Sequence, residues 1–168
     1  QPSRETCPKN TKSKEANSTK CDSCGLGEES EKGSAKCTKC EAGTFSNVVG
    51  EACETCDPGF YRSSSMNSTT CRQCPEGWSN SDHGSTGCNA VPPGSYTLNG
   101  VEKICQPGYT CTGANASQIP CPNGTYTNNI GSVSCIPCSP GTFSSKNGSV
   151  ECNECPAGYL QPEPEQSK

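Results

Sequence analysis

The sequence predicts a small disulfide-rich fold: an elongated tandem array of about ten short looped β-hairpin units with little regular secondary structure. Cysteines make up 17 of the 168 residues, a density typical of secreted disulfide scaffolds. Without them the apolar fraction of 29% falls to about a fifth, too little for a chain of this size to fold by apolar burial alone. Most cysteines also recur as Cys-x-x-Cys pairs, which define a repeat of about 16 to 18 residues.

Charge and patterning exclude several classes of protein. The 18 glycines and 14 prolines argue against long helices, and no apolar run is long enough to insert directly into a membrane. The net charge of −4 gives no basic surface for nucleic acid. No signal peptide is visible and the chain starts at Gln1, so we expect a processed or excised piece of a longer product.

Each repeat is expected to contain two tight turns that need residues with a positive φ, because only Gly and Asn occupy the two turn positions. The first-turn positions hold Asn10, Gly27, Gly43, Gly59, Gly77, Gly94, Gly108, Gly124, Gly141 and Gly158. The second-turn positions hold Asn17, Gly33, Gly50, Asn67, Gly84, Gly131 and Gly148. Between the two turns the residues can form two short antiparallel strands, which makes each repeat a looped hairpin.

Aromatic residues follow the first turn by one or two positions. They are Phe45, Phe60, Tyr61, Trp78, Tyr96, Tyr109, Tyr126, Phe143 and Tyr159. We expect each ring to cover a disulfide or to pack on the neighbouring repeat, since something must fill the small interior. The alternative role is an aromatic ladder that binds a ligand.

An irregular stretch of the sequence indicates how the cysteines pair. After Cys88 the register predicts cysteines at 91, 102 and 118, where the chain has Val91, Glu102 and Gln118. Loss of both ends of one repeat indicates that the two ends bond to each other. An extra Cys111 then offers a partner to Cys105. The predicted disulfides are Cys7–Cys21, Cys24–Cys37, Cys40–Cys53, Cys56–Cys71, Cys74–Cys88, Cys105–Cys111, Cys121–Cys135 and Cys138–Cys152.

This scheme leaves Cys155 over in this chain. A partner with the usual spacing would lie at about 168 to 170. We therefore expect a chain that continues past Lys168, with a reactive thiol as the alternative.

Zinc is the alternative chemistry for Cys-x-x-Cys pairs, whose spacing approaches that of zinc ribbons. The array is continuous rather than grouped in fours, cysteines disappear in twos, and His83 is the only histidine. No βαβ pattern surrounds a pair, which argues against a thioredoxin-like redox role. We expect no metal site and no cofactor.

No catalytic constellation is found, and we expect no enzyme activity. His83 lies in a polar NSDHGS turn and is interpreted as solvated, while Glu28, Glu29 and Asp82 are interpreted as solubilising charges. Calcium binding lacks a loop of the EF-hand type.

Five Asn-x-Ser/Thr sequons are candidate sites for N-linked glycans, since turns of a secreted chain are exposed to the glycosylation machinery. The asparagines are Asn17, Asn67, Asn115, Asn123 and Asn147.

The repeat resembles a known extracellular pattern. Segments such as CPNGTYTNNIGSVSC (121–135) and CSPGTFSSKNGSVEC (138–152) resemble ephrin-receptor-type cysteine-rich repeats, and are similar also to TNF-receptor-like repeats and to cysteine-rich surface antigens of protists. The resemblance extends from Cys7 to Gly158. It implies an extracellular rod that presents, spaces or binds, and no enzyme.

The chain is expected to contain polar N-terminal capping repeats (1–40), regular repeats (41–90), degenerate repeats with altered cysteines (91–121), regular repeats (122–160) and a Pro-containing tail or incomplete repeat (161–168). The repeat that lacks its disulfide, between Val91 and Glu102, is expected to be a bend or a looser joint.

The leading functional hypothesis is a structural or interaction rod, secreted or at the cell surface, within a larger surface or filament-forming glycoprotein. Its partners would be other protein chains, including copies of itself in a filament. The alternatives are a ligand-binding fragment of a receptor ectodomain and an intracellular zinc protein.

Overall fold

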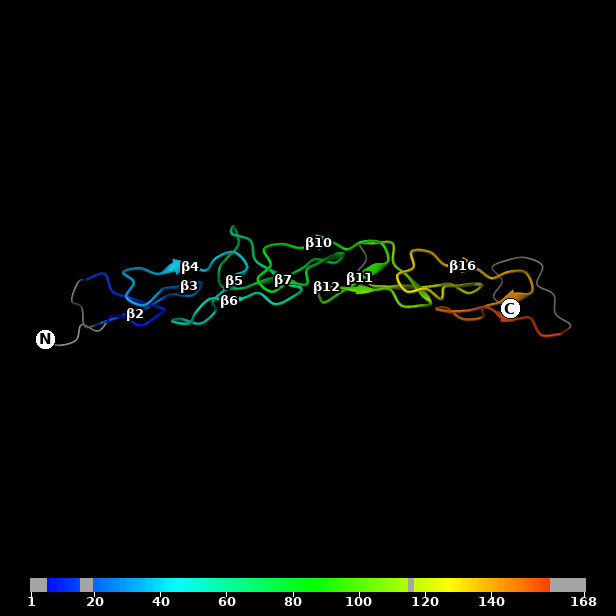
Figure 1. Cartoon of the computed structure of the whole chain (residues 1–168), viewed down its shortest axis with the longest axis horizontal. Coiled ribbons are helices and arrows are strands. Elements are labelled where there is room, and N and C mark those ends of the chain that lie inside the picture. Colours follow the sequence, from blue (N-terminus) through cyan, green and yellow to red (C-terminus); the bar gives the residue numbers. More distant parts are fainter. Residues whose placement is uncertain (1–5, 16–19, 115–116, 158–168) are drawn as a thin grey trace. The chain divides into compact units, whose positions relative to one another are not determined.

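The computed structural model describes residues 6–15, 20–114 and 117–157. Within these ranges there is no helix, and the regular structure consists of 18 short strands in nine two-stranded antiparallel sheets (Figure 1). The predicted class, a small disulfide-rich array of looped hairpins, is confirmed. The tenth unit, which begins at Cys155, extends beyond the described residues.

Each sheet joins two strands that are consecutive along the chain. The pairs are β1 (Thr11–Lys12) with β2 (Asp22–Ser23), β3 (Glu28–Glu29) with β4 (Thr38–Lys39), β5 (Thr44–Phe45) with β6 (Glu54–Thr55), β7 (Phe60–Tyr61) with β8 (Arg72–Gln73), β9 (Trp78–Ser79) with β10 (Asn89–Ala90), β11 (Ser95–Leu98) with β12 (Val101–Ile104), β13 (Tyr109–Thr110) with β14 (Ile119–Pro120), β15 (Thr125–Tyr126) with β16 (Ile136–Pro137), and β17 (Thr142–Phe143) with β18 (Asn153–Glu154).

The position of the second strand in the chain differs from the sequence-based expectation. We expected both strands to lie between the two turns, but in six of the nine described hairpins the second strand is the two-residue spacer of a Cys-x-x-Cys pair, as in β6 between Cys53 and Cys56. The following N–H continues this ladder: Cys56 donates to the carbonyl of Gly43 over 2.8 Å. An extended spacer therefore both ends one hairpin and leads into the next disulfide.

The first turns have the predicted backbone. Positive φ is found at Asn10 and at every first-turn glycine from Gly27 to Gly141, while Gly158 lies outside the described residues. In the turn 57–60, Phe60 N–H donates to the carbonyl of Asp57 over 3.0 Å and Gly59 has φ 84°. That is a β-turn with a glycine where type II geometry requires one.

The second turns agree with the prediction at the glycines and differ at Asn67. Gly33, Gly50, Gly84, Gly131 and Gly148 have positive φ, whereas Asn67 does not, and Asn17 is not among the described residues. The Oδ1 atom of Asn67 instead accepts a hydrogen bond from Thr69 N–H over 3.1 Å. This Asx-type turn reverses the chain without a left-handed residue.

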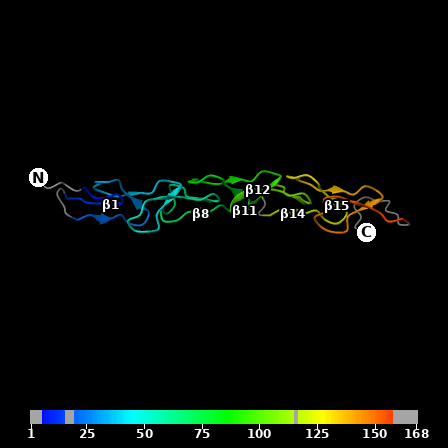
Figure 2. The same ribbon diagram turned by 60° about the horizontal axis from the view of Figure 1, so that its bottom comes forward.

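The repeat without a disulfide is closed by a longer hairpin. Strands β11 and β12 pair over four residues each and lie side by side in both views (Figure 1 and Figure 2). Asn99 and Gly100 connect them with φ of 54° and 77°, the geometry of a type I′ turn. Val91 is only 3% exposed at the place of the missing first cysteine.

The interior consists mainly of cysteines and polar side chains. Its buried apolar members among the described residues are nine cysteines and Val91. A polar residue three positions after the first turn points inward in most repeats, and we call this the inward position. It is buried at Ser30, Ser46, Arg62, Asn80, Thr97, Thr127 and Ser144. Cys111 takes it in the repeat that starts at Cys105.

The described aromatic rings do not fill this interior, contrary to expectation. Every one of them is half-buried or exposed, and Trp78 is 46% exposed. Side chains alternate between two faces along a strand, so the rings directly before the inward position face the other side; these are Phe45, Tyr61, Tyr96, Tyr126 and Phe143. Tyr109 nevertheless contacts a neighbour, because its ring atoms lie close to Gly148.

Backbone hydrogen bonds join each repeat to the next. The first-turn N–H donates to the carbonyl at the inward position of the following repeat, as from Gly43 to Arg62 over 2.8 Å. The second-turn N–H donates to the carbonyl of the first cysteine in the preceding repeat, as from Gly84 to Cys56 over 2.8 Å. Stacking thus depends on backbone groups that any sequence would supply.

First-turn glycines also touch the second turn two repeats further along. A Cβ at Gly43 would lie 2.7 Å from the carbonyl carbon of Gly84, and one at Gly108 would lie 2.9 Å from that of Gly148. These glycines are therefore needed for close backbone approach as well as for their φ.

The chain divides into two compact units. One comprises residues 1–74 and 80–88, and the other comprises residues 75–79 and 89–168. The contacts given above each lie within one of these units.

Alanine substitutions distinguish the two reasons why these turns need glycine, a positive φ and a close approach to another backbone segment. Gly141→Ala tests φ alone, because φ is 85° there and no described atom lies within 4 Å of the added Cβ. We expect a loss of about 1–2 kcal/mol in the free energy of unfolding. Gly43→Ala should cost clearly more, since its Cβ also meets the backbone of Gly84.

Gly87→Ala is the matched control, with neither positive φ nor a neighbour within 4 Å. It should change stability by less than about 0.5 kcal/mol. Urea unfolding of the oxidised protein measures all three variants. Equal losses for Gly43→Ala and Gly141→Ala would show that the approach to Gly84 does not matter.

Candidate functional site

Eight disulfides organise the chain, and the structure brings the sixteen predicted cysteines together in the predicted pairs. The Cα atoms of the bonded residues lie 5.6 to 6.1 Å apart. The first cysteine of each pair is buried, and the second is more exposed except in Cys105–Cys111. There both sulfur atoms are inside, because Cys111 occupies the inward position.

This pairing bears on the zinc alternative. The two cysteines of each Cys-x-x-Cys belong to different disulfides, so their thiolates are not available together as metal ligands. No cluster of three or more His, Cys, Asp or Glu suited to a metal is found among the described residues. Cys155 is half-buried, and its N–H donates to the carbonyl of Gly141 over 2.9 Å.

The acidic residues singled out in the sequence have specific contacts. Glu29 accepts a hydrogen bond from Cys53 N–H over 3.1 Å, and Glu28 accepts one from Gly25 N–H over 3.4 Å. Both side chains are half-buried. Glu28 and Glu29, interpreted from the sequence as solubilising charges, thus each also satisfy a backbone donor. Asp82 is exposed, and its carbonyl accepts from the Ser85 hydroxyl over 2.7 Å.

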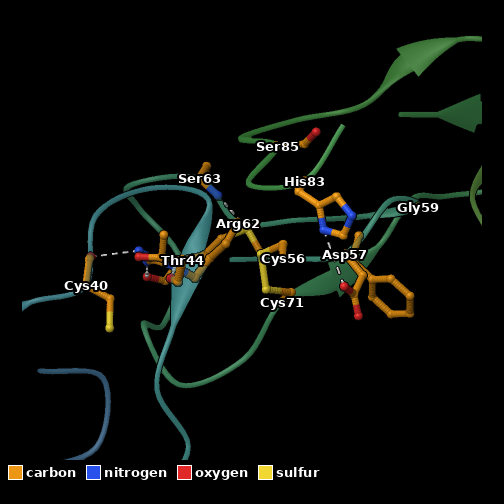
Figure 3. Close-up of a disulfide and its surroundings, with 12 residues drawn as sticks. Cys40, Thr44, Cys56, Asp57, Gly59, Arg62, Ser63, Cys71, His83 and Ser85 are labelled. Carbon is orange, nitrogen blue, oxygen red and sulfur yellow. Dashed lines mark hydrogen bonds and ion pairs between the residues drawn. A yellow bond between two sulfur atoms is a disulfide. The ribbon is translucent and has the colours of Figure 1, made fainter. Parts of the chain in front are cut away.

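His83 has a partner that the sequence did not suggest. Its Nδ1 lies 3.5 Å from Oδ1 of Asp57, which belongs to the preceding repeat (Figure 3). Both side chains are mostly exposed, so solvent screens the pair and it contributes little to stability. The interpretation of His83 as solvated stands, with the addition of this contact.

Arg62 is the most unusual residue of the array, and the sequence analysis did not single it out. Its side chain is only 2% exposed, and its guanidinium donates exclusively to backbone carbonyls in the described part of the chain. Figure 3 shows it directed toward the segment from Cys40 to Thr44. The acceptors are the carbonyls of Thr44, Cys40 (2.7 Å), Glu41 and Met66 (3.4 Å).

Other repeats accomplish the same task with a hydroxyl. At the inward position, Ser46 donates to the carbonyl of Val48 over 3.0 Å, and Ser30 donates to that of Thr11 over 2.7 Å. The fold therefore accepts a neutral hydroxyl at this position and does not require a positive charge. An Arg where the other repeats have Ser, Thr, Asn or Cys was the available sequence signal.

A cavity of about 380 Å³ lies beside Arg62 in the same unit. Most of its lining comes from the loop that follows Arg62, together with the end of β4. The lining residues are Lys39, Cys40, Arg62, Ser64, Ser65, Met66, Asn67 and Ser68. This loop belongs to the repeat 56–71, whose disulfide spans 15 residues, the longest separation of the eight.

Three of the five sequons lie in the described part of the chain. Asn67, Asn123 and Asn147 are exposed, and each belongs to a turn or loop. Asn17 and Asn115 lie outside the described residues.

Comparison with known protein families gives a direct match. The family model described as "Tyrosine-protein kinase ephrin type A/B receptor-like" matches residues 43–89 and 108–150, together more than half of the chain. Both segments begin at a first-turn glycine, and the stretch between them contains the β11–β12 hairpin. This is a receptor-type cysteine-rich repeat rather than an enzyme family.

A search of curated proteins gave no significant match. In the ranges that the structure covers, no helix has the length and apolar character needed to cross a bilayer.

Replacement of Arg62 should strongly destabilise the unit formed by residues 1–74 and 80–88. Arg62→Ala leaves several buried carbonyls without a donor, and we expect a loss of about 3 kcal/mol. Arg72→Ala is the control, since Arg72 is an exposed residue of β8 in the same repeat and should change stability by less than about 0.5 kcal/mol. Urea unfolding of the oxidised protein provides the comparison, and similar small losses in both variants would disprove a structural role for Arg62.

Proposed function

The chain belongs to the ephrin receptor-like cysteine-rich repeat family, and from that premise we propose that it is an extracellular interaction module whose disulfide-braced repeats present exposed side chains to partner proteins. One observation carries this proposal: the interior uses cysteines and short polar residues, so the large apolar side chains are left outside. Leu26, Val48, Val49, Phe60, Trp78, Leu98, Ile104, Ile119, Ile130, Val133, Ile136 and Val150 are all exposed.

The disulfides and the repeat type support an extracellular location. Disulfides persist in oxidising compartments and are rare in the cytosol. We place the module in a secreted or cell-surface protein, where cross-linked repeats also resist proteolysis. Its mechanism is binding, with no catalytic step and no cofactor, in keeping with a receptor-type repeat family.

Attached glycans are part of this proposal. Asn67, Asn123 and Asn147 are exposed and carry the sequon, so the oligosaccharyltransferase of the secretory pathway would accept them. The glycans would add bulk and leave the disulfide interior unchanged.

A filament-forming module is the second candidate. Seven aliphatic residues of the unit formed by 75–79 and 89–168 are exposed by 44% to 67%, and such side chains can contact another copy as readily as a different protein. They are Leu98, Ile104, Ile119, Ile130, Val133, Ile136 and Val150.

Sedimentation velocity separates the two candidates. An interaction module for other proteins should sediment as one monomeric species over a wide concentration range, because its apolar residues await a different partner. Growth of the sedimentation coefficient with concentration would contradict this proposal and favour a filament. Ile130→Ser, at the most exposed aliphatic residue, should then reverse the growth while leaving stability unchanged.

Glycosylation is tested by intact mass after secretion from eukaryotic cells. We expect peptide-N-glycosidase to lower the mass, and Asn123→Gln and Asn147→Gln each to remove one glycan. Asn89→Gln is the control, since Asn89 is exposed but lies in Asn-Ala-Val and not in a sequon. A secreted protein with the bare polypeptide mass would refute this part of the proposal.

A further inference from the structure

The positive charge of Arg62 is not neutralised by a neighbouring carboxylate. The ion pairs among the described residues are Lys9–Glu31 and His83–Asp57, and neither involves Arg62. Four of its N–H groups donate to carbonyls, which leaves one of the five guanidinium donors without an acceptor in the described part of the chain. A buried cation without a counter-charge is costly, so an anion close to Arg62 would be favoured.

The cavity beside Arg62 has the chemistry to hold such an anion. It combines two cations, Lys39 and Arg62, with hydroxyl donors from Ser64, Ser65 and Ser68, and no acidic residue is part of its lining. Its volume of about 380 Å³ lies within the range of small-ligand sites. A guanidinium and an ammonium together with hydroxyl donors are the groups that proteins use to bind oxyanions.

Stability alone does not explain the charge. The inward position is occupied by Ser30, Ser46 and Ser144 in other repeats, where a neutral hydroxyl satisfies the surrounding backbone. The repeat that has Arg62 at this position also has the longest disulfide loop, three consecutive serines at 63–65 and the adjoining cavity. These features together indicate a role of the charge in this cavity.

We propose that the cavity bordered by Lys39, Arg62 and residues 64–68 binds a small ligand through a tetrahedral oxyanion, the chemistry shared by sulfate and phosphate groups. Arg62 supplies a fixed positive potential from below the surface, Lys39 supplies a second and mobile cation, and the serine hydroxyls donate hydrogen bonds. The volume accommodates an oxyanion attached to a sugar-sized group. This site is independent of the protein partners proposed above.

The test is a titration followed by amide and arginine side-chain NMR at constant ionic strength, with sodium chloride exchanged for the probe. The probes are sodium sulfate, sodium phosphate and N-acetylglucosamine 6-sulfate, with N-acetylglucosamine as the neutral control. We expect saturable shifts at residues 64–68 and at the Arg62 Nε–H with the anionic probes alone. Tighter binding of the sulfated sugar than of sulfate would identify an esterified ligand, and tighter binding of phosphate would identify a free or phosphorylated one.

Variants assign the shifts to the cavity. Lys39→Gln should weaken binding up to about fivefold, the contribution of one exposed ion pair, and Lys36→Gln, an exposed lysine outside the lining, should bind as the parent does. Arg62→Ser restores the residue of neighbouring repeats and should abolish saturation. Retention of dispersed amide signals from residues 40–71, the two repeats that border the cavity, would show that this variant is folded there.

Three results would overturn the proposal. They are shifts that never saturate, equal shifts with neutral N-acetylglucosamine, and equal affinity of the Arg62→Ser or Lys39→Gln variant and the parent protein. A monomeric protein that binds no oxyanion would overturn this site and leave the proposed interaction module standing.

Discussion

The disulfide that closes each repeat is the interaction on which the remaining structure depends. Each bond joins cysteines 13 to 15 residues apart, except for Cys105–Cys111, and closing a loop of about 15 residues contributes roughly 3 kcal/mol through the unfolded chain. Order is therefore created locally, repeat by repeat. Because the first cysteine of each bond is buried, the same sulfur atoms also serve as the apolar interior, and Val91 takes over that role where the bond is missing.

The repeats are joined to one another in a different way, by close approach of their backbones. The N–H groups of the first and second turns donate to carbonyls of adjacent repeats, and Gly43 and Gly108 lie against turns two repeats away. A side chain at these glycines would push the repeats apart. The element that these repeats share in their stacking is thus the geometry of the peptide backbone, which places no constraint on the outward side chains.

The first-turn glycines and the end-to-end register of the cysteines could be predicted from the sequence, because both follow from spacing within the chain. The burial of Arg62 could not, because most of its acceptors are carbonyls of the preceding repeat. The rings were expected in the interior, which is filled by cysteines and polar side chains instead. The strand formed by the Cys-x-x-Cys spacer pairs within its own repeat, but our expectation placed both strands between the two turns. The turn at Asn99 and Gly100 could have been predicted, because Asn-Gly is a strong sequence signal for a hairpin. We did not predict it, because the interpretation of this region concentrated on its irregular cysteines. At Asn67 a side-chain hydrogen bond replaced the expected positive φ.

Function then resides in what the scaffold leaves unconstrained: exposed apolar side chains, sequons, and a charged residue at a position that elsewhere needs only a hydroxyl. All of these assignments presuppose bridges that close within single repeats. Proteolysis of the oxidised protein without reduction, followed by mass spectrometry of the linked peptides, tests this most directly. The account predicts peptides joined through Cys40–Cys53 and through Cys105–Cys111. Peptides that join Cys40 to Cys74, or cysteines recovered as thiols with bound zinc, would contradict it.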